Sequence, residues 1–268
     1  MPEWQKTAEW PLASFSTMVA LMGGYVVVIK GLQAFMKNRE ALRCTMAGHV
    51  HNVIMTALSA YVFFGMGYDV IQNWKENNFD PSLAVCDPEL KLSKNADYWF
   101  WIFYVSKFYE YIDTILLVLR KKPVIFLHAY HHFITASIVW AAWIFPGASN
   151  WVGPITNAFV HIWMYAYYMA ADFGLSRKWG AYITKIQLTQ FMGCIALWAC
   201  VGLAMIPDNS CKTPAESFSW LCLQYVIFLY LFRRFDSKRN GKKPAAATAT
   251  KSVAASAAGN EVEDKKRE

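Results

Sequence analysis

Long apolar segments alternate with short polar segments along the chain, and this pattern predicts the secondary structure. A helix needs about 20 mostly apolar residues to cross the hydrocarbon core of a bilayer. Seven segments approach that length, and they cover residues 12–29, 47–70, 99–119, 124–145, 152–173, 182–206 and 218–232. Because backbone polar groups inside a bilayer must bond within their own segment, we expect an all-α, polytopic membrane protein with seven transmembrane helices.

The end of the chain differs from the rest in composition. From residue 241 onward it consists mainly of Ala, Thr, Ser and Lys and contains no aromatic residue. Such a segment buries too little apolar surface to order itself. The sequence therefore predicts a membrane domain over residues 1–240 and a disordered cytosolic tail over residues 241–268.

Composition excludes several classes of protein. The 268 residues are 56% hydrophobic and 17% charged, whereas about a quarter of the residues in a soluble domain are charged. The net charge of +7 would indicate a nucleic-acid ligand in a soluble protein, but here the cations lie between the apolar segments and in the tail. We therefore expect the lipid bilayer as the surroundings and no nucleic-acid partner.

The distribution of Lys and Arg predicts the orientation. With a lumenal N-terminus, nineteen of the 26 Lys and Arg fall on the cytosolic side and five on the lumenal side. Cytosolic loops collect positive charge, so we expect a cytosolic C-terminus. Lys265 and Lys266 are the fourth and third residues from the end and match a dilysine retrieval signal, which predicts the endoplasmic reticulum membrane. The alternative is an ordinary charged tail.

Two cysteines stand apart from the others. Cys86 and Cys211 lie in the two longer loops that the charge distribution places in the lumen, an oxidising compartment. We predict a disulfide between them; two free thiols are the alternative. The remaining four cysteines lie in or beside apolar segments, where cysteine is usually a small apolar residue.

Polar residues within the third and fourth segments are the first candidates for function, because ionisable groups in a bilayer are costly. The fourth segment carries an HxxHH box, whose three imidazoles point to one side of a helix. These are His128, His131 and His132. The third segment places Lys107, Glu110, Asp113 and Thr114 on or beside one face, where Lys107 and Glu110 can pair at i and i+3.

The fifth and sixth segments add further polar residues. On the fifth, one stripe carries Asn157, His161, Tyr165 and Tyr168. On the sixth, Lys185, Gln187 and Gln190 lie near the cytosolic end. We expect these four segments to bury their polar groups against one another as one chamber that opens toward the cytosol.

Three kinds of chemistry fit such a chamber. The first is a histidine-box, metal-dependent oxidoreductase of the desaturase or hydroxylase type, but a di-iron centre needs about eight or more histidines and this chain has six, with His49 and His51 outside the box. A mononuclear zinc site stays open. The second, transport or reception, has no specific motif here. The third is acyl transfer, with imidazole as nucleophile or base.

Four motifs in order carry a family resemblance. Residues 107–114 match KxxExxDT, 128–132 match HxxHH, 157–168 match NxxxHxxMYxYY and 184–190 match TxxQxxQ. Their order and spacing resemble the very-long-chain fatty acid elongase family, the ELO type. The resemblance implies a 3-ketoacyl-CoA synthase that condenses a long-chain acyl-CoA with malonyl-CoA to 3-oxoacyl-CoA, CoA and carbon dioxide. It also implies seven helices, six of them forming a barrel around an acyl tunnel, and no metal or bound cofactor.

The resemblance further implies the roles of individual residues. His131 would accept the acyl group with His161 as its partner, and His128 and His132 would orient His131 or polarise the thioester. The basic turn Arg120, Lys121 and Lys122, together with Lys185, would meet the CoA phosphates. The remaining motif residues would bind substrate. The segment around the basic turn favours saturated and monounsaturated chains. The expected partners are the ketoreductase, dehydratase and enoyl reductase of the elongation cycle, and a second copy in a homodimer.

Overall fold

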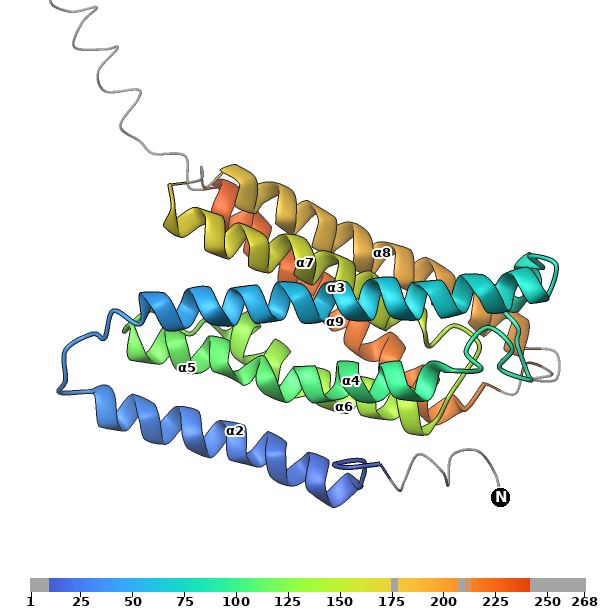
Figure 1. Ribbon diagram of the computed structural model, residues 1–268, viewed down its shortest axis with the longest axis horizontal. Helices are drawn as coiled ribbons and strands as arrows, with labels where there is room; N and C mark the ends of the chain where they lie inside the picture. The colour runs from blue at the N-terminus through green and yellow to red at the C-terminus, as the bar shows by residue number, and fades with distance from the viewer. Residues whose placement is uncertain (1–9, 175–177, 207–210, 212, 242–268) are drawn as a thin grey trace, which may run out of the picture. The chain divides into compact units, whose positions relative to one another are not determined.

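The computed structural model describes residues 10–174, 178–206, 211 and 213–241, and all regular secondary structure in these ranges is helical (Figure 1). The elements are α2 (Phe15–Met36), α3 (Thr45–Glu76), the short 3-10 helix η1 (Pro81–Ala84), α4 (Ala96–Tyr109), α5 (Tyr111–Leu119), α6 (Phe126–Ile144), α7 (Val152–Asp172), α8 (Lys178–Met205) and α9 (Ala215–Gly241). The all-α prediction is confirmed for this part of the chain.

Each of the seven predicted apolar segments coincides with helix. The third is divided, because α4 and α5 are separated at Glu110, which ends one helix and begins the next. The ends also differ: α8 begins at Lys178 and α9 continues to Gly241, so both helices extend beyond their apolar centres into polar residues. The basic turn between α5 and α6 has the predicted place, with Lys121 in a left-handed conformation at φ 50°.

Four helices, α2, α3, α8 and α9, have the length and apolar composition needed to cross a membrane. The break at Glu110 leaves α4 and α5 too short to qualify separately. The helices α6 and α7 are long enough, but their polar side chains lower the mean hydropathy. The structure thus supports a membrane protein, while the further spans stay predictions.

The helices of the unit Met1–Phe232 contact one another in a closed order. Helix α3 packs against α4 and α7, α4 packs against α6, and α7 packs against α8. Helix α9 contacts α6 through a 2.7 Å hydrogen bond from Tyr130 to Gln224, and it contacts α8 through the rings of Phe191 and Phe228. These contacts form a ring of six helices in the order α3, α4, α6, α9, α8 and α7. Helix α2 packs beside this ring against α5 and α6 (Figure 1).

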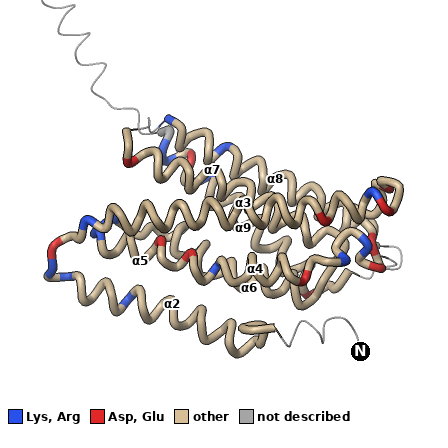
Figure 2. The backbone as a smooth tube through the Cα atoms, in the orientation of Figure 1, with Lys and Arg blue, Asp and Glu red and all other residues tan. Residues whose placement is uncertain are grey.

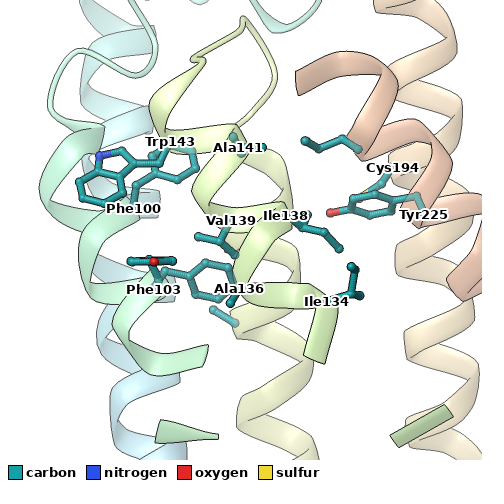
Figure 3. Close-up of a cluster of buried hydrophobic side chains, with 14 of the residues drawn as sticks. Phe100, Phe103, Ile134, Ala136, Ile138, Val139, Ala141, Trp143, Cys194 and Tyr225 are labelled. Carbon is teal, nitrogen blue, oxygen red and sulfur yellow. The ribbon is translucent and has the colours of Figure 1, made fainter. Parts of the chain in front are cut away.

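Large apolar side chains fill part of the space within this ring (Figure 3). Phe100 and Phe103 of α4 lie beside Val139 and Trp143 of α6, and Tyr225 of α9 lies at the other side of α6. All five are buried. Close packing of this kind fixes the helix faces, and therefore fixes which polar residues point inward.

Three loops meet at one end of the ring. A disulfide joins Cys86, after η1, to Cys211, between α8 and α9, which is the pairing that the sequence predicted. Ser149, in the loop between α6 and α7, donates a hydrogen bond to the carbonyl oxygen of Ala84 in η1. The loops that follow η1, α6 and α8 are therefore tied together.

The second unit, Arg233–Glu268, is described only as far as Gly241. It holds the last turns of α9, in which Arg239 pairs with Asp236. Lys265 and Lys266, the predicted dilysine signal, lie outside the described residues.

Candidate active site

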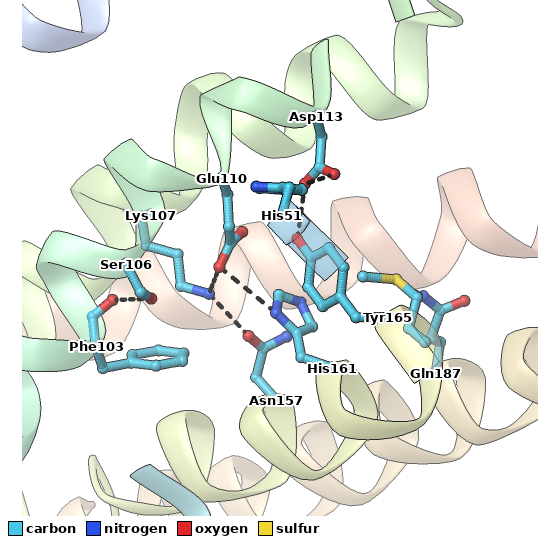
Figure 4. A network of polar contacts seen from close by, with 11 residues as sticks. His51, Phe103, Ser106, Lys107, Glu110, Asp113, Asn157, His161, Tyr165 and Gln187 are labelled. Carbon is cyan, nitrogen blue, oxygen red and sulfur yellow. Dashed lines mark hydrogen bonds and ion pairs between the residues drawn. The ribbon is translucent and has the colours of Figure 1, made fainter. Parts of the chain in front are cut away.

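The break between α4 and α5 places a buried ion pair at the centre of the ring (Figure 4). Lys107 Nζ donates to Glu110 Oε1 at 2.7 Å and to Asn157 Oδ1 of α7 at 3.0 Å. The two charged side chains are 1% and 0% exposed. Lys107 Nζ also lies 4.0 Å from the centre of the Phe103 ring. The pairing expected from the i, i+3 spacing is thus present, and the bond from Lys107 to Asn157 ties α4 to α7.

His161 of α7 joins this pair. Its Nδ1 lies 3.5 Å from Glu110 Oε1, and the residue is buried (Figure 4). Glu110 Oε2, in contrast, has no partner in the described part of the chain. A carboxylate with a free oxygen beside an imidazole can orient that imidazole or hold a proton for it.

The histidine box of α6 faces the same centre. The rings of His128 and His132 are 4.3 Å apart, and those of His131 and His132 are 5.3 Å apart. His131 lies 6.5 Å from the ring of His161 across the interface with α7. Thr114 Oγ1 of α5 lies 2.9 Å from His128 Nε2, which fixes the orientation of that ring. The box and its predicted partner therefore lie together.

A second polar group lies next to the first and contains a residue that the sequence did not single out. Tyr165 donates from its hydroxyl to Asp113 Oδ2 at 2.7 Å, and His51 Nε2 of α3 lies 3.0 Å from Asp113 Oδ1 (Figure 4). The ring of Tyr165 stands edge-on to His161 at 5.5 Å. His51 thus supports, through Asp113 and Tyr165, one side of His161. A buried histidine in an apolar segment was the only signal for it.

A narrow cavity begins at the histidine box. Its volume is about 50 Å³, so a chain-like ligand enters only if lining side chains move apart. His131 lines it, whereas His128, His132 and His161 do not. The lining is otherwise mainly apolar and comprises Phe103, Lys107, Thr135, Ile138, Val139, Ala142, Asn150, Gly153, Pro154, Asn157, Gln190, Phe191, Leu221, Tyr225 and Phe228.

The cavity runs along α6 away from the box. Thr135, Ile138 and Ala142 follow His131 at helical spacing, and eleven residues of α-helix rise about 16 Å. Gly153 lies near the start of α7, eight residues before His161, so it marks the end far from the histidines. That end lies beside the loop after α6, where Asn150 donates to the carbonyl oxygens of Ala142 and Phe145.

The other predicted site residues lie at varied distances from this centre. Gln190 lines the cavity, and Gln187 donates to the sulfur of Met164 at 3.7 Å. Tyr168 is 44% exposed, with its ring 6.0 Å from that of Tyr165. Lys185 is exposed and lies 5.5 Å from the ring of Tyr182. The structure therefore brings Gln190 to the cavity and leaves Lys185 and Tyr168 toward its outside.

The basic turn contacts a different part of the molecule. Arg120 donates to the carbonyl oxygen of Cys44 at 2.7 Å, and Lys121 Nζ donates to that of Lys37 at 3.3 Å. Lys121 and Lys122 line a second cavity that shares no lining residue with the first. Contact between this turn and CoA stays a prediction.

One cluster has the donor types of a metal site. Glu110, His131 and His132 each offer one ligand atom, and these atoms lie within 4.8 Å of one another. The ammonium group of Lys107 bonds to Glu110, however, so a cation at this place would be repelled by it. The arrangement is better suited to nucleophilic chemistry, in which a desolvated imidazole attacks a carbonyl carbon while neighbouring groups move the proton.

Comparison with known proteins gives a consistent result. Residues 10–246 match the family model described as ELO, the GNS1/SUR4 family. A fatty acid elongase of Dictyostelium discoideum is 34% identical over 242 residues, covering 87% of each chain. The very long chain fatty acid elongase 6 of Drosophila melanogaster is 31% identical over 240 residues, covering 87% of this chain and 75% of the relative. Fatty acid elongase 5 of Trypanosoma cruzi is 30% identical over 235 residues, covering 86% of each chain.

Proposed function

This chain belongs to the ELO family of fatty acid elongases, and from that premise we propose that it condenses a long-chain acyl-CoA with malonyl-CoA, giving 3-oxoacyl-CoA, CoA and carbon dioxide. The observation that carries the proposal is the position of His131. It is the one member of the described histidine box that lines the narrow, mainly apolar cavity, where the carbonyl end of an acyl chain would meet its ring nitrogen. The family assignment gives no support to the metal-dependent alternative.

The first half-reaction transfers the acyl group to the protein. A ring nitrogen of His131 attacks the thioester carbonyl, the new C–N bond forms, and the C–S bond breaks. The thiolate of CoA takes the proton that the imidazole loses, so acyl-imidazole and free CoA result. His132, whose ring lies 5.3 Å from that of His131, can hold the proton during this exchange.

The second half-reaction forms the new carbon–carbon bond. Malonyl-CoA loses carbon dioxide, and the electron pair of the broken bond becomes an enolate that attacks the acyl carbonyl carbon. The C–N bond to His131 breaks as the ketone forms, and the released imidazole takes up one proton. Asn157 and Lys107, which line the cavity beside His131, are placed to hold the developing oxyanion.

The groups behind the reacting imidazole position it. Glu110 faces His161, and Thr114 fixes His128. His51 and Asp113 hold Tyr165 against the edge of His161. We assign these as positioning residues, because fixed neighbours reduce the reorganisation that a reaction in a dry site requires.

The architecture that we propose adds the bilayer to these helices. The helices α4 with α5, α6 and α7 complete seven spans, six helices form a barrel around the acyl tunnel, and the polar chamber faces the cytosol. Lys185, exposed at the start of α8, is a candidate contact for a CoA phosphate. We further propose that the protein lies in the endoplasmic reticulum membrane and forms a homodimer. Its partners would be the other enzymes of the cycle, and it would prefer saturated and monounsaturated chains.

A direct assay tests the reaction. Full-length protein in detergent micelles receives a panel of acyl-CoA substrates and malonyl-CoA labelled at its methylene carbon. We expect labelled 3-oxoacyl-CoA and an equal amount of released carbon dioxide with long saturated or monounsaturated chains. Absence of product with every acyl-CoA of the panel would overturn the proposed function.

The far end of the cavity is expected to limit product length. A methyl group at Gly153 would lie 2.9 Å from the hydroxyl oxygen of Tyr225, and both residues line the cavity. Gly153→Ala should therefore narrow this end and shorten the longest product by at least about one two-carbon cycle, since the tyrosine must shift to relieve the contact. Chromatography of the products from a series of saturated acyl-CoA primers measures the change.

Gly193→Ala is the matched control. Gly193 lies on α8, and a methyl group added there meets no atom within 4 Å. The control should give the product distribution of the unmodified protein. The same distribution from Gly153→Ala would place the limit on product length elsewhere.

A further inference from the structure

A second cavity, of about 400 Å³, lies where α2 ends and the turn between α5 and α6 begins. Its lining is mostly lysine and apolar residues. The lysines are Lys37, Lys121 and Lys122, and the apolar residues are Met36, Val118, Pro123 and Val124. Figure 2 shows Lys and Arg at this end of α2 and α5, with acidic colouring in the loop that follows α2. The cavity thus combines a cationic rim with an apolar floor.

The charges of this cavity are only partly explained by the fold. Helices α2 and α5 both end here, and cations stabilise helix C-termini. Lys121 serves this purpose by bonding to the carbonyl oxygen of Lys37. Among the lining residues there is no carboxylate, and no described acidic group pairs with the ammonium groups of Lys37 or Lys122. Three neighbouring lysines with no carboxylate among the lining residues form a site suited to phosphate.

Apolar packing separates this cavity from the histidine box. Tyr25, Ile29, Met36 and Val118 form a buried cluster that also contacts Phe133, the residue after His132. Tyr25 adds to this separation between α2 and α5, because its hydroxyl lies 3.1 Å from Thr114 Oγ1, which also bonds to His128. A thioester whose phosphates occupy the second cavity therefore has no open path to His131 through this buried cluster.

The position of the cavity along the bilayer normal indicates which kind of phosphate it would bind. The candidate span of α2 ends at Met36, so Lys37 lies where the helix leaves the hydrocarbon and where lipid phosphates are found. Basic cavities between membrane helices at this depth recognise anionic headgroups. The apolar floor of Met36, Val118 and Val124 would then contact the glycerol and the first acyl carbons.

We propose that this cavity binds the phosphate headgroup of an anionic phospholipid. The inference goes beyond the proposed function, because the ligand is neither of the reacting thioesters and the site lies apart from His131. Binding would fix α2 against α5 and α6, the helices that carry Thr114 and the histidine box.

Native mass spectrometry of the full-length protein in nonionic detergent tests the proposal. The probes are dioleoyl-phosphatidylinositol, dioleoyl-phosphatidylcholine and free CoA. We expect the unmodified protein to retain phosphatidylinositol in preference to phosphatidylcholine, and Lys37→Gln to weaken this retention about fivefold, the usual effect of one interfacial lysine. Gln33→Trp, which fills the cavity at a lining position without changing its charge, should weaken it as well.

Lys30→Gln is the matched control, because it removes one charge from α2 at a residue that does not line the cavity. It should bind phosphatidylinositol as the unmodified protein does. Equal binding by Lys37→Gln and Lys30→Gln would overturn the proposal. So would a loss of CoA binding in Lys37→Gln with lipid retention unchanged, since the cavity would then belong to the substrate. Condensation is measured separately, so failure of either proposal is recognised independently.

Discussion

His131→Ala protein is expected to lose condensation activity by about 1,000-fold or more, because the substitution removes the group that, in the mechanism we propose, forms the acyl intermediate. His131 is the box histidine that reaches the narrow cavity, so no neighbouring imidazole can replace it without a change of helix packing. Formation of labelled 3-oxoacyl-CoA from malonyl-CoA labelled at its methylene carbon measures the loss. Incubation of the unmodified protein with acyl-CoA alone should give an acylated peptide that contains His131.

His128→Ala is the informative comparison. His128 bonds to Thr114 and does not line the cavity, so we expect a smaller loss of activity and continued acylation of His131. An acylated peptide from another residue, or full condensation activity in His131→Ala, would contradict the mechanism. Comparable elution of all three proteins in size-exclusion chromatography excludes misfolding as the cause.

Lys107→Met is expected to lower the free energy of unfolding by about 3–5 kcal/mol, which is the usual cost of removing one partner of a buried ion pair. Glu110 would keep a fully buried carboxylate without its 2.7 Å ammonium partner, and the bond from Lys107 to Asn157 between α4 and α7 would also be lost. Titration of the purified protein with SDS, followed by tryptophan fluorescence, measures the change.

The double variant Lys107→Met/Glu110→Leu separates stability from catalysis. Replacing both charges by apolar groups should restore most of the lost stability, since no unpaired charge remains in the core. Condensation should stay low, because Glu110 also contacts His161 and Lys107 lines the cavity. Wild-type stability of Lys107→Met alone would show that neither the ion pair with Glu110 nor the bond to Asn157 stabilises the fold.

Helical periodicity was sufficient to predict the parts of the site that lie on one helix. It placed His128, His131 and His132 on one face of α6, and it paired Lys107 with Glu110. The four motifs also indicated the family. Each of these features depends on residues close together in the chain, where backbone geometry fixes which side chains meet.

Helical periodicity could not predict contacts between residues that lie far apart in the sequence. His51 meets Asp113 across 62 positions, and the spacing of His51 to its neighbours gives no sign of that partner. The break at Glu110 was also not predicted, because the apolar run continues through it and only the buried charges interrupt the helix. The contacts of the basic turn were not predicted either. Its Arg120 and Lys121 side chains donate to the carbonyl oxygens of Cys44 and Lys37, at the start of α3 and the end of α2, and the sequence does not reveal these contacts.

The disulfide between Cys86 and Cys211 has a consequence for the biogenesis of the protein. Its two cysteines are 125 positions apart, and the segments that form α4 to α8 are all synthesised between them. The bond can close only after Cys211 has left the ribosome and the loop after α8 has reached the loop after η1. Oxidation of this pair therefore marks a chain in which α4 to α8 have been synthesised and the loops after η1 and α8 have met, and its time course during translation would report when this part of the ring assembles, whether or not α9 has joined it.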